Sequence, residues 1–336
     1  MRLFRAEISR VLRRRLTWIL AIGAFAVPLV VAVMLSMESR TEATDAERAQ
    51  AEQEWQRLQD DVEKCKEDPE AFFIDWGYPE EHASDMTESE CEMELSWANG
   101  PEDFLYVYTF DLSEEGRLLI ANISLVGALA AMVLAASAIG AEWSSGGMSN
   151  LLLWHPNRWK VYAAKCAAAV GLSAVYMAAY TAAVFGIFYL VAELRGTMGE
   201  MDSAWWSDMN GTLVRTAVLG VFAALVGATF TFLGKHTALT GGVVIGGLVL
   251  SNIAGPIITA ITNPTYPDLL SPSYWLDAWS YGETELWPAN GTIESMNGTE
   301  PEKYLLTWDM IGIGMLIVAL VLVVLSSWSF RRRDIA

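Results

Sequence analysis

Six long blocks of apolar residues, almost free of charged side chains, decide what this chain can fold into. Each block holds at least 21 residues, and about 20 apolar residues are enough to cross the core of a bilayer. The blocks cover residues 16–37, 118–141, 161–192, 212–233, 237–262 and 310–330. We therefore predict an all-α polytopic membrane protein with six transmembrane helices, a pattern that excludes a soluble enzyme.

Charge is distributed unevenly between the segments that connect the blocks. The chain has 22 basic and 40 acidic residues, and its net charge of −18 excludes a nucleic-acid binder because it repels phosphate. One side of the predicted membrane holds only Glu7, Glu142 and Asp334 among the acidic residues. Its basic residues are Arg2, Arg5, Arg10, Arg13, Arg14, Arg15, Arg158, Lys160, Lys165, Lys235, Arg331, Arg332 and Arg333. Because cytoplasmic segments are enriched in Lys and Arg, we predict a plasma-membrane protein with both termini and the loop 142–160 in the cytoplasm.

The first residues predict a helix that lies on the cytoplasmic face of the membrane. In residues 1–15, Phe4, Ile8, Val11 and Leu12 recur at steps of three and four, with arginines largely on the other faces. This is the pattern of an interfacial amphipathic helix, and a basic flank that only sets the topology is the alternative. We expect the first span to be retained, because its apolar stretch is too long for a signal peptide and no Ala-x-Ala-like cleavage site follows it.

The largest predicted extracellular segment, residues 38–117, is strongly acidic. Its residues 38–115 hold 25 carboxylates and five basic side chains. The stretch from Glu38 to Glu67 has no Gly or Pro and predicts a helix that rises from the first span, whereas 104–110 predicts a short strand or a surface-lying segment. Cys65 and Cys91 lie on the side where a disulfide can persist, so we predict that they are bonded to each other.

The other connections complete the predicted topology. Residues 193–211 and 263–309 form outer loops, and we expect the second, rich in Pro and Trp, to re-enter or lie on the membrane near 274–279. Residues 331–336 form a cytoplasmic tail. The third block would be about 48 Å long as a helix, longer than the roughly 30 Å core of a bilayer. We therefore expect its inner end to project into the cytoplasm, with Lys165 reaching the headgroups.

The absence of several sequence motifs and of charged residues within the apolar blocks limits the classes of function that fit this chain. No block carries Asp, Glu or Arg in its middle, which disfavours an ion-coupled transporter without excluding one that uses carbonyls and hydroxyls. Gly234-Lys235 precedes His236, where a nucleotide-binding P-loop needs Ser or Thr, and no zinc-protease or Cys-x-x-Cys motif occurs. We therefore expect no enzyme activity, metal or cofactor in this chain, and energy for active transport must come from another polypeptide.

The predicted cytoplasmic loop carries the positive signal. From Gly140 to Lys160 it reads GAEWSSGGMSNLLLWHPNRWK, in which Ser144 or Ser145 is suited to cap a short helix and Pro156 to end it. Such a helix can dock in the groove of a partner and pull on both adjoining spans, and a surface hairpin without a partner is the alternative. Its predicted apolar face consists of Met148, Leu151, Leu152 and Leu153.

This string resembles the signature of type-2 ABC export permeases, particularly the actinobacterial members. The membrane subunits of these ATP-driven exporters are similar in other features: a basic amphipathic N-terminal helix, six spans, a Pro/Trp-rich last outer loop and a short basic C-terminus. The resemblance implies that ATP and Mg²⁺ bind to a separate ATPase subunit, present in two copies. Above the ATPases, two identical or homologous permeases would face each other among membrane lipids. The size and acidity of 38–115 depart from the family pattern.

The resemblance also implies two sets of site residues. The first set contacts the ATPase and consists of Glu142, Gly146, Gly147, Asn150 and Arg158. The second set lines a translocation route between the paired permeases, along the second and fifth spans, and consists of Asn122, Ser124, Ser137, Thr240, Ser251 and Asn252. Packing inside the six-helix bundle is the alternative for the second set. Gly242 and Gly246 have the Gly-x-x-x-Gly spacing that permits close contact between helices.

These features together predict the permease subunit of an ATP-driven exporter. Because the predicted route is uncharged and lined by small residues, an amphipathic or lipid-like cargo fits it better than a small ion. The alternative is a membrane scaffold or sensor whose acidic extracellular domain binds a ligand or a partner. Co-purification distinguishes the two hypotheses, since only the exporter predicts an ATPase bound in a fixed ratio.

Overall fold

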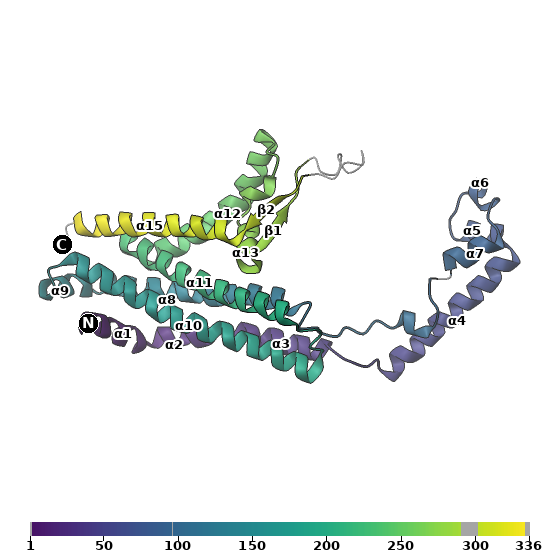
Figure 1. Cartoon of the computed structure of the whole chain (residues 1–336), viewed down its shortest axis with the longest axis horizontal. Coiled ribbons are helices and arrows are strands. Elements are labelled where there is room, and N and C mark those ends of the chain that lie inside the picture. Colours follow the sequence, from purple (N-terminus) through teal and green to yellow (C-terminus); the bar gives the residue numbers. More distant parts are fainter. Residues whose placement is uncertain (1, 96, 290–301, 333–336) are drawn as a thin grey trace. The chain divides into compact units, whose positions relative to one another are not determined.

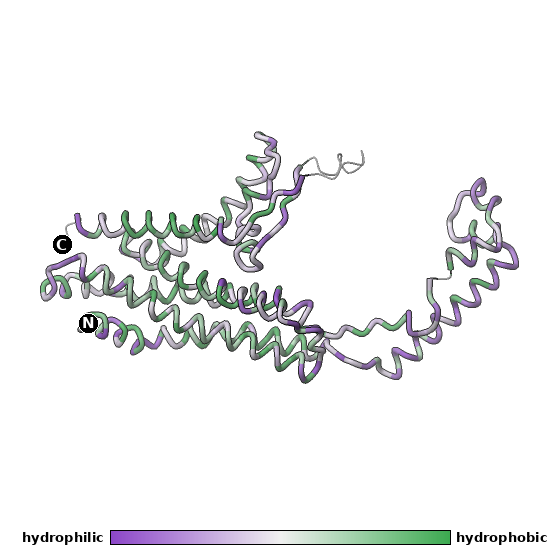
Figure 2. The backbone as a smooth tube through the Cα atoms, viewed as in Figure 1, coloured by the Kyte–Doolittle hydropathy of each residue, from purple (hydrophilic) through white to green (hydrophobic). Residues whose placement is uncertain are grey.

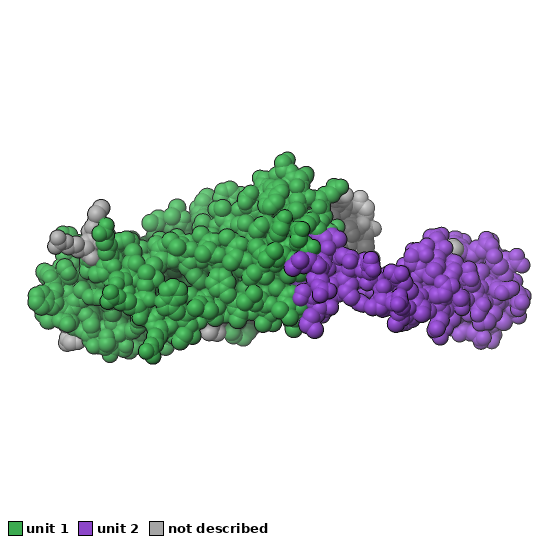
Figure 3. Space-filling model, turned by 90° about the horizontal axis from the view of Figure 1, so that it is seen from below, with its two compact units in different colours: residues 1–34, 111–193, 198–336 green, residues 35–110, 194–197 purple. Residues whose placement is uncertain are grey.

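The structure, a computed structural model of the chain, describes residues 2–95, 97–289 and 302–332. It divides into two compact units, which Figure 3 shows in different colours. We call Met1–Met34, Asp111–Glu193 and Met198–Ala336 the spanning unit, and Leu35–Phe110 with Leu194–Thr197 the acidic unit. Parts of the predicted loop 263–309 and of the predicted tail 331–336 lie outside the described residues.

The spanning unit consists almost entirely of helices (Figure 1). Its elements are α1 (Arg2–Leu12), α2 (Arg15–Gly23), α3 (Ala26–Glu38), α8 (Gly116–Ser144), α9 (Gly147–Trp154), α10 (Arg158–Arg195), α11 (Ser203–Gly234), α12 (Thr237–Thr262), the 3-10 helix η2 (Pro267–Leu270), α13 (Pro272–Tyr281), β1 (Glu283–Leu286), β2 (Tyr304–Thr307) and α15 (Trp308–Arg332). The last residues of α3 and α10 belong to the acidic unit.

The described residues include five helices long and apolar enough to cross a membrane. They are α2 and α3 taken together as Arg15–Glu38, then α8, α10, α11 and α15. Figure 2 shows apolar residues along most of each of these helices. The predicted polytopic helical architecture is therefore confirmed. The fifth predicted span corresponds to the 26-residue helix α12, of which the described residues establish only Val249–Thr262 as a shorter apolar helix, so the count of six stays a prediction.

The first span is bent where α2 meets α3, and Pro28 explains the position of the bend. A proline inside a helix has no N–H to donate to the carbonyl four residues earlier, and its ring crowds that carbonyl. The affected carbonyl belongs to Ala24, which lies between the two helices. The hydroxyl of Tyr180 on α10 donates to this oxygen over 3.2 Å, and Tyr180 is fully buried. The neighbouring helix therefore supplies the hydrogen bond that the proline removes.

Helices α8 and α11 pack closely because small residues line their contact. Ala128 and Ala131 on α8 and Ala224 and Ala228 on α11 are all buried there. A Cβ atom added at Gly227 would collide with the backbone carbonyl of Met132. Small side chains at such positions allow helix backbones to approach within van der Waals contact, which replaces the hydrophobic effect inside a lipid bilayer.

Two arginines, one near the start of α8 and one within α11, hold the C-terminal end of α13. A guanidinium nitrogen of Arg117 donates to the carbonyl of Tyr281, and Arg215 donates to that of Ser280 over 3.2 Å. These carbonyls lie at the C-terminal end of α13, where cations bind favourably. The predicted stretch 274–279 is thus helical, and the two-stranded antiparallel ribbon β1–β2 follows it, an addition that the all-α prediction did not contain.

The acidic unit is a group of short helices around one long helix. It contains α4 (Asp45–Glu67), α5 (Pro69–Asp75), α6 (Glu80–Ala83), α7 (Glu88–Leu95) and the 3-10 helix η1 (Pro101–Phe104). The prediction of one helix rising from the first span through Glu38–Glu67 is wrong, because α3 ends at Glu38 and α4 begins at Asp45. Thr44 and Glu47 form a reciprocal capping box, which starts a new helix at that point.

Extended segments connect the helices of the acidic unit. The segment 104–110 is irregular beyond η1, so the expected strand is wrong and the surface-lying alternative stays a prediction; two of its residues bond to the backbone of Arg40. The Arg40 amide donates to the Tyr108 carbonyl over 2.9 Å, and the Thr109 hydroxyl donates to the Arg40 carbonyl over 2.6 Å. The two chain segments that enter and leave the unit are therefore hydrogen bonded to each other.

A disulfide closes the small core of the acidic unit. Cys65 on α4 and Cys91 on α7 are bonded, as predicted, and are fully buried. Phe73, Ala83 and Leu95 complete the buried cluster around them. A core of this size contributes little hydrophobic stabilisation. The covalent link between α4 and α7 therefore supplies a larger share of the unit's stability than it would in a large domain.

We expect that removing the disulfide loosens the acidic unit without affecting the spans. A Cys65→Ser/Cys91→Ser variant should lose about 3–4 kcal/mol of unfolding free energy, the value expected for a loop of this length. Limited proteolysis of the full-length protein measures the loss as faster cleavage within 45–95. Cys166→Ala, which removes the thiol on α10, is the control and should leave this cleavage unchanged. Equal cleavage of all three proteins would show that the disulfide does not stabilise the unit.

The start of α4 should open in acid. Hydrogen bonds from Arg40 and from Thr44 lower the pKa of Glu47 from 4.5 to about 2. A carboxylate with a lowered pKa in the folded state stabilises it above the unfolded value, and that contribution is lost as the pH falls from about 4.5 towards about 2. Hydrogen exchange of the α4 amides, corrected for intrinsic rates, should accelerate over this range. In Glu47→Gln the acid-induced increase should be absent, and an equal increase in that variant would contradict the assignment.

Candidate functional site

The short helix α9 connects α8 and α10 in place of the predicted loop 142–160. It begins after Gly146, whose φ of +68° is a conformation that glycine adopts far more readily than other residues. The predicted capping by Ser144 or Ser145 is wrong, because α8 extends through Ser144 and the Ser144 hydroxyl donates back to the Ala141 carbonyl. Helix α9 ends at Trp154, two residues before Pro156, as the proline predicts.

One face of α9 is anchored in the core of the spanning unit. Met148 and Leu151 are buried in a cluster with residues of α8, α10, α11 and α15. In this cluster the rings of Tyr162 on α10, Phe232 on α11 and Phe330 on α15 contact one another. The Tyr162 hydroxyl also bonds to that of Ser326, 2.7 Å away. Met148 and Leu151 therefore pack α9 against four long helices at once.

The opposite face of α9 is apolar and exposed. Leu153 is 82% exposed and Trp154 is 80% exposed, while Asn150 lies beside them on the surface. A hollow of about 550 Å³ adjoins this face. Its lining consists of Arg10, Glu142, Gly147, Asn150, Leu151, Trp154 and His155. Trp154 was not among the residues predicted from the sequence, and its position directly after the apolar run 151–153 and shortly before Pro156 is the signal that could have identified it.

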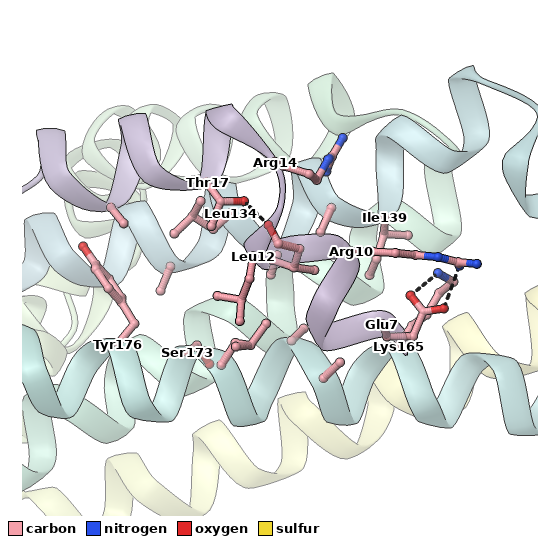
Figure 4. A pocket seen from close by; sticks show the side chains of 18 of the residues that line it. Glu7, Arg10, Leu12, Arg14, Thr17, Leu134, Ile139, Lys165, Ser173 and Tyr176 are labelled. Carbon is pink, nitrogen blue, oxygen red and sulfur yellow. Dashed lines mark hydrogen bonds and ion pairs between the residues drawn. The ribbon is translucent and has the colours of Figure 1, made fainter. Parts of the chain in front are cut away.

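Four charged side chains meet where α1, α8 and α10 come together. Figure 4 labels three of them, Glu7, Arg10 and Lys165. The Lys165 ammonium lies 2.7 Å from a carboxylate oxygen of Glu7 and 2.5 Å from one of Glu142. Arg10 lies 3.0 Å from the other oxygen of Glu7 and 3.8 Å from that of Glu142. We call this alternating set of two cations and two carboxylates the ion cluster. It connects α1 to the C-terminal end of α8, directly before α9.

The ion cluster corrects the expectation for Lys165. Its side chain is 2% exposed, so it does not reach towards headgroups. Two carboxylates within 2.7 Å of the ammonium make burial tolerable, since a buried charge needs opposite charges and hydrogen bonds around it. Glu142, expected to contact an ATPase, directs its carboxylate to Lys165 and is largely buried, and its contact with an ATPase stays a prediction. Its position links α9 to α1 and α10.

The other four residues expected at an ATPase interface lie on α9, directly before it, or at the start of α10. Gly147 begins α9 and lines the hollow beside it. Arg158 begins α10, where its guanidinium donates to the carbonyl of Arg331 over 3.1 Å and to that of Phe330 over 3.4 Å. This contact binds the C-terminal end of α15 to the segment that follows α9. Gly146 and Asn150 are exposed beside the apolar face of α9.

The six residues expected along a translocation route are scattered between the interior and the surface of the chain. Ser124 and Thr240 are buried, and Thr240 bonds to Thr231 on α11 over 3.0 Å. Asn122 is exposed, whereas Ser137 and Ser251 are partly buried. The side chain of Asn252 lies outside the described part of the chain. Their role in a route between two subunits stays a prediction.

The charged and apolar side chains at this end of the molecule connect helices to one another. Within residues 2–95, 97–289 and 302–332, no three His, Cys, Asp or Glu side chains group closely enough to hold a metal ion. The carboxylates of the ion cluster are neutralised by Lys165 and Arg10. The arrangement presents the exposed apolar face of α9, whose other face packs against α8, α10, α11 and α15.

Removing the central cation should destabilise the folded protein. We expect Lys165→Met to cost roughly 3–5 kcal/mol, because it leaves the carboxylates of Glu7 and Glu142 with Arg10 as their one remaining cation and so leaves one negative charge uncompensated. Unfolding of the purified chain in detergent measures the loss. The triple variant Glu7→Gln/Glu142→Gln/Lys165→Met should recover most of it, and Lys160→Met, at an exposed position on the same helix, should change stability little. Equal stability of Lys165→Met and Lys160→Met would contradict the importance of the cluster.

Comparison with known proteins identifies the family of this chain. A search of curated proteins finds no match. The model of the ABC-2 family transporter proteins, in contrast, matches residues 1–335. The match covers the basic N-terminal helix, all the helices described above and α9 with its exposed face. The chain therefore belongs to the ABC-2 transporter family and is a multi-pass membrane protein of the permease type.

Proposed function

We propose that this protein is the permease subunit of an ATP-driven exporter and that its ATPase is a separate polypeptide that docks on α9. The observation that carries the proposal is the exposed pair Leu153 and Trp154 at the end of a helix whose other face is buried. Exposed large apolar side chains of this kind commonly mark a protein interface, and tryptophan is among the residues that contribute most to binding.

Coupling between the two subunits follows from how α9 is attached. Movement of a docked ATPase would displace α9, and the cluster of Met148, Leu151 and the surrounding rings would carry the displacement into α8, α10, α11 and α15. The ion cluster would transmit the same displacement to α1 through Glu142. In this mechanism the ATPase binds ATP and Mg²⁺, and the permease changes its access from one side of the membrane to the other.

The charge distribution supports a cytoplasmic position for α9. Arginines of α1 and the basic residues Arg158, Lys160 and Lys235 all lie near the same ends of the spans as α9. Positively charged segments favour the cytoplasmic side. With α9 in the cytoplasm, both termini also lie there, and the acidic unit faces the exterior, where its disulfide persists.

A second permease subunit would pack against the glycine face of α12. Within the described residues, a Cβ atom at Gly241, Gly242, Gly246 or Gly247 would meet nothing within 4 Å. Apolar residues of the same helix, such as Leu250 and Ile253, are exposed. Since small residues allow close packing of helices in a bilayer, this face suits an identical or homologous subunit, with one ATPase below each permease.

Substitutions on the exposed face of α9 should weaken binding of the ATPase. We expect Trp154→Ala to cost about 2 kcal/mol, or about 30-fold in affinity, as for a central interface tryptophan. Leu153→Asp should have a similar effect. Quantitative mass spectrometry of the subunits that co-purify with the tagged permease measures it. Trp328→Ala, which removes an exposed tryptophan from α15, is the matched control and should retain the ATPase.

Two results would contradict the proposal in different ways. Recovery of the ATPase with the two α9 variants at the level of the unaltered protein would show that docking occurs elsewhere. Absence of any ATPase from preparations of the unaltered protein would contradict the exporter hypothesis as a whole. That result would favour a membrane scaffold whose acidic unit binds a partner.

A further inference from the structure

A large cavity lies beside the ion cluster, enclosed by the N-terminal helices and two spans. Its volume is about 970 Å³, at the upper end of the roughly 300–1,000 Å³ of typical ligand sites. Residues of α1 and α2 form one wall, and residues of α8 and α10 form the others (Figure 4). We call it the N-terminal cavity. The mechanism proposed above does not use it.

Small apolar side chains create this space. The helices α8 and α10 contribute to its walls the alanines Ala131, Ala135, Ala138, Ala141, Ala168, Ala169 and Ala179. Leu134, Ile139 and Leu172 supply most of the remaining apolar surface of these walls. Ordered water needs two to four polar partners, and walls of this composition provide few of them away from the charged end. An apolar ligand is therefore the suitable occupant.

One end of the cavity is basic. Its charged lining consists of the cations Arg10, Arg13, Arg14 and Lys165 and the carboxylates Glu7 and Glu142, which leaves two positive charges in excess. Arg10 and Lys165 are neutralised within the ion cluster. In the described part of the chain no carboxylate lies within ion-pair distance of Arg13 or Arg14. Arg13 is exposed, and one guanidinium nitrogen of Arg14 donates to the Ser137 carbonyl over 2.8 Å, which leaves its other N–H groups available. The excess charge therefore resides on these two arginines.

We propose that the N-terminal cavity binds one phospholipid with an anionic headgroup, whose phosphate contacts Arg13 and Arg14 and whose acyl chain fills the space between α2, α8 and α10. The charge of the rim selects the headgroup, because arginine forms strong charge-assisted hydrogen bonds with phosphate. Membrane lipid is the apolar molecule available at high concentration to a cavity in a spanning bundle, and its acyl chain matches the alanine-lined walls.

Tyr176 allows a test of whether the ligand is apolar at the end of the cavity far from the ion cluster. Its hydroxyl is buried in the cavity wall and has no hydrogen-bond partner within the described residues. It lies 11 residues along α10 from Lys165, which is about 16 Å at the rise of a helix. A phospholipid carries its polar groups near the charged end and only methylene groups at that depth. The bound chain would therefore leave the hydroxyl of Tyr176 without a partner.

Native mass spectrometry of the full-length protein tests the proposal. The protein is purified in mild detergent, titrated with either phosphatidylglycerol or phosphatidylcholine of the same acyl composition, and the bound lipids are counted. We expect one phosphatidylglycerol molecule per chain to be retained at least tenfold more strongly than phosphatidylcholine. This measurement requires neither ATP nor the partner subunit, so its result is independent of the proposed function.

Two sets of variants separate the apolar space from the basic rim. Ala138→Phe fills the cavity and should abolish the retained lipid, whereas Val133→Phe places the same side chain on the exposed face of α8, outside the cavity lining, and should retain it. Arg13→Gln/Arg14→Gln should remove the preference for phosphatidylglycerol. Arg5→Gln changes the same charge on α1 outside the cavity lining and should leave the preference intact.

Three outcomes would overturn the proposal. One is equal retention of lipid by Ala138→Phe and Val133→Phe. Another is a preference for phosphatidylglycerol that survives removal of both arginines. The third is weaker binding of lipid by Tyr176→Phe than by the unaltered protein, because that result would require a ligand with a polar group beside Tyr176. Unchanged binding by Tyr176→Phe supports the acyl chain.

Discussion

The contact of Lys165 with two carboxylates from different helices is the interaction on which the rest of the spanning unit depends. An ammonium that is 2% exposed cannot remain charged without opposite charges beside it, and Glu7 and Glu142 are the groups that supply them. Their contacts connect α1 and α10 to the last turn of α8, directly before α9 begins. The apolar packing of α8, α10 and α11 tolerates small shifts, whereas separating these charges is costly. This makes the ion cluster the fixed point around which the α9 end of the bundle is organised.

The sequence predicts well those features that depend on the local chain. Block length and hydropathy predict the five spans that the structure describes, and the position of Cys65 and Cys91 in one polar segment predicts their disulfide. It predicts less well where two local signals compete. The Ala- and Glu-rich run after Glu38 favours a continuous helix, but the capping box of Thr44 and Glu47 interrupts it.

Contacts between distant residues could not be predicted in the same way. Lys165 and Glu7 are 158 positions apart. From the sequence alone, a lysine near the end of a span is equally compatible with an ion pair inside the protein and with a side chain that reaches the lipid headgroups. Arg158 likewise contacts a carbonyl 173 residues away. The candidate site was predicted correctly as a short helix with an apolar face, but the sequence could not show that Met148 and Leu151 turn inward while Leu153 and Trp154 turn outward. That division depends on helices from elsewhere in the chain.

The hydrogen bond from Tyr180 to Ala24 has a consequence for the biogenesis of the protein. The first apolar segment emerges from the ribosome more than 150 residues before the tyrosine that completes it. Until then Pro28 leaves one carbonyl of that segment unbonded in the lipid phase, at a cost of several kcal/mol. The segment therefore inserts as an incomplete element, and its final bent conformation is attained only when α10 has entered the bilayer beside it.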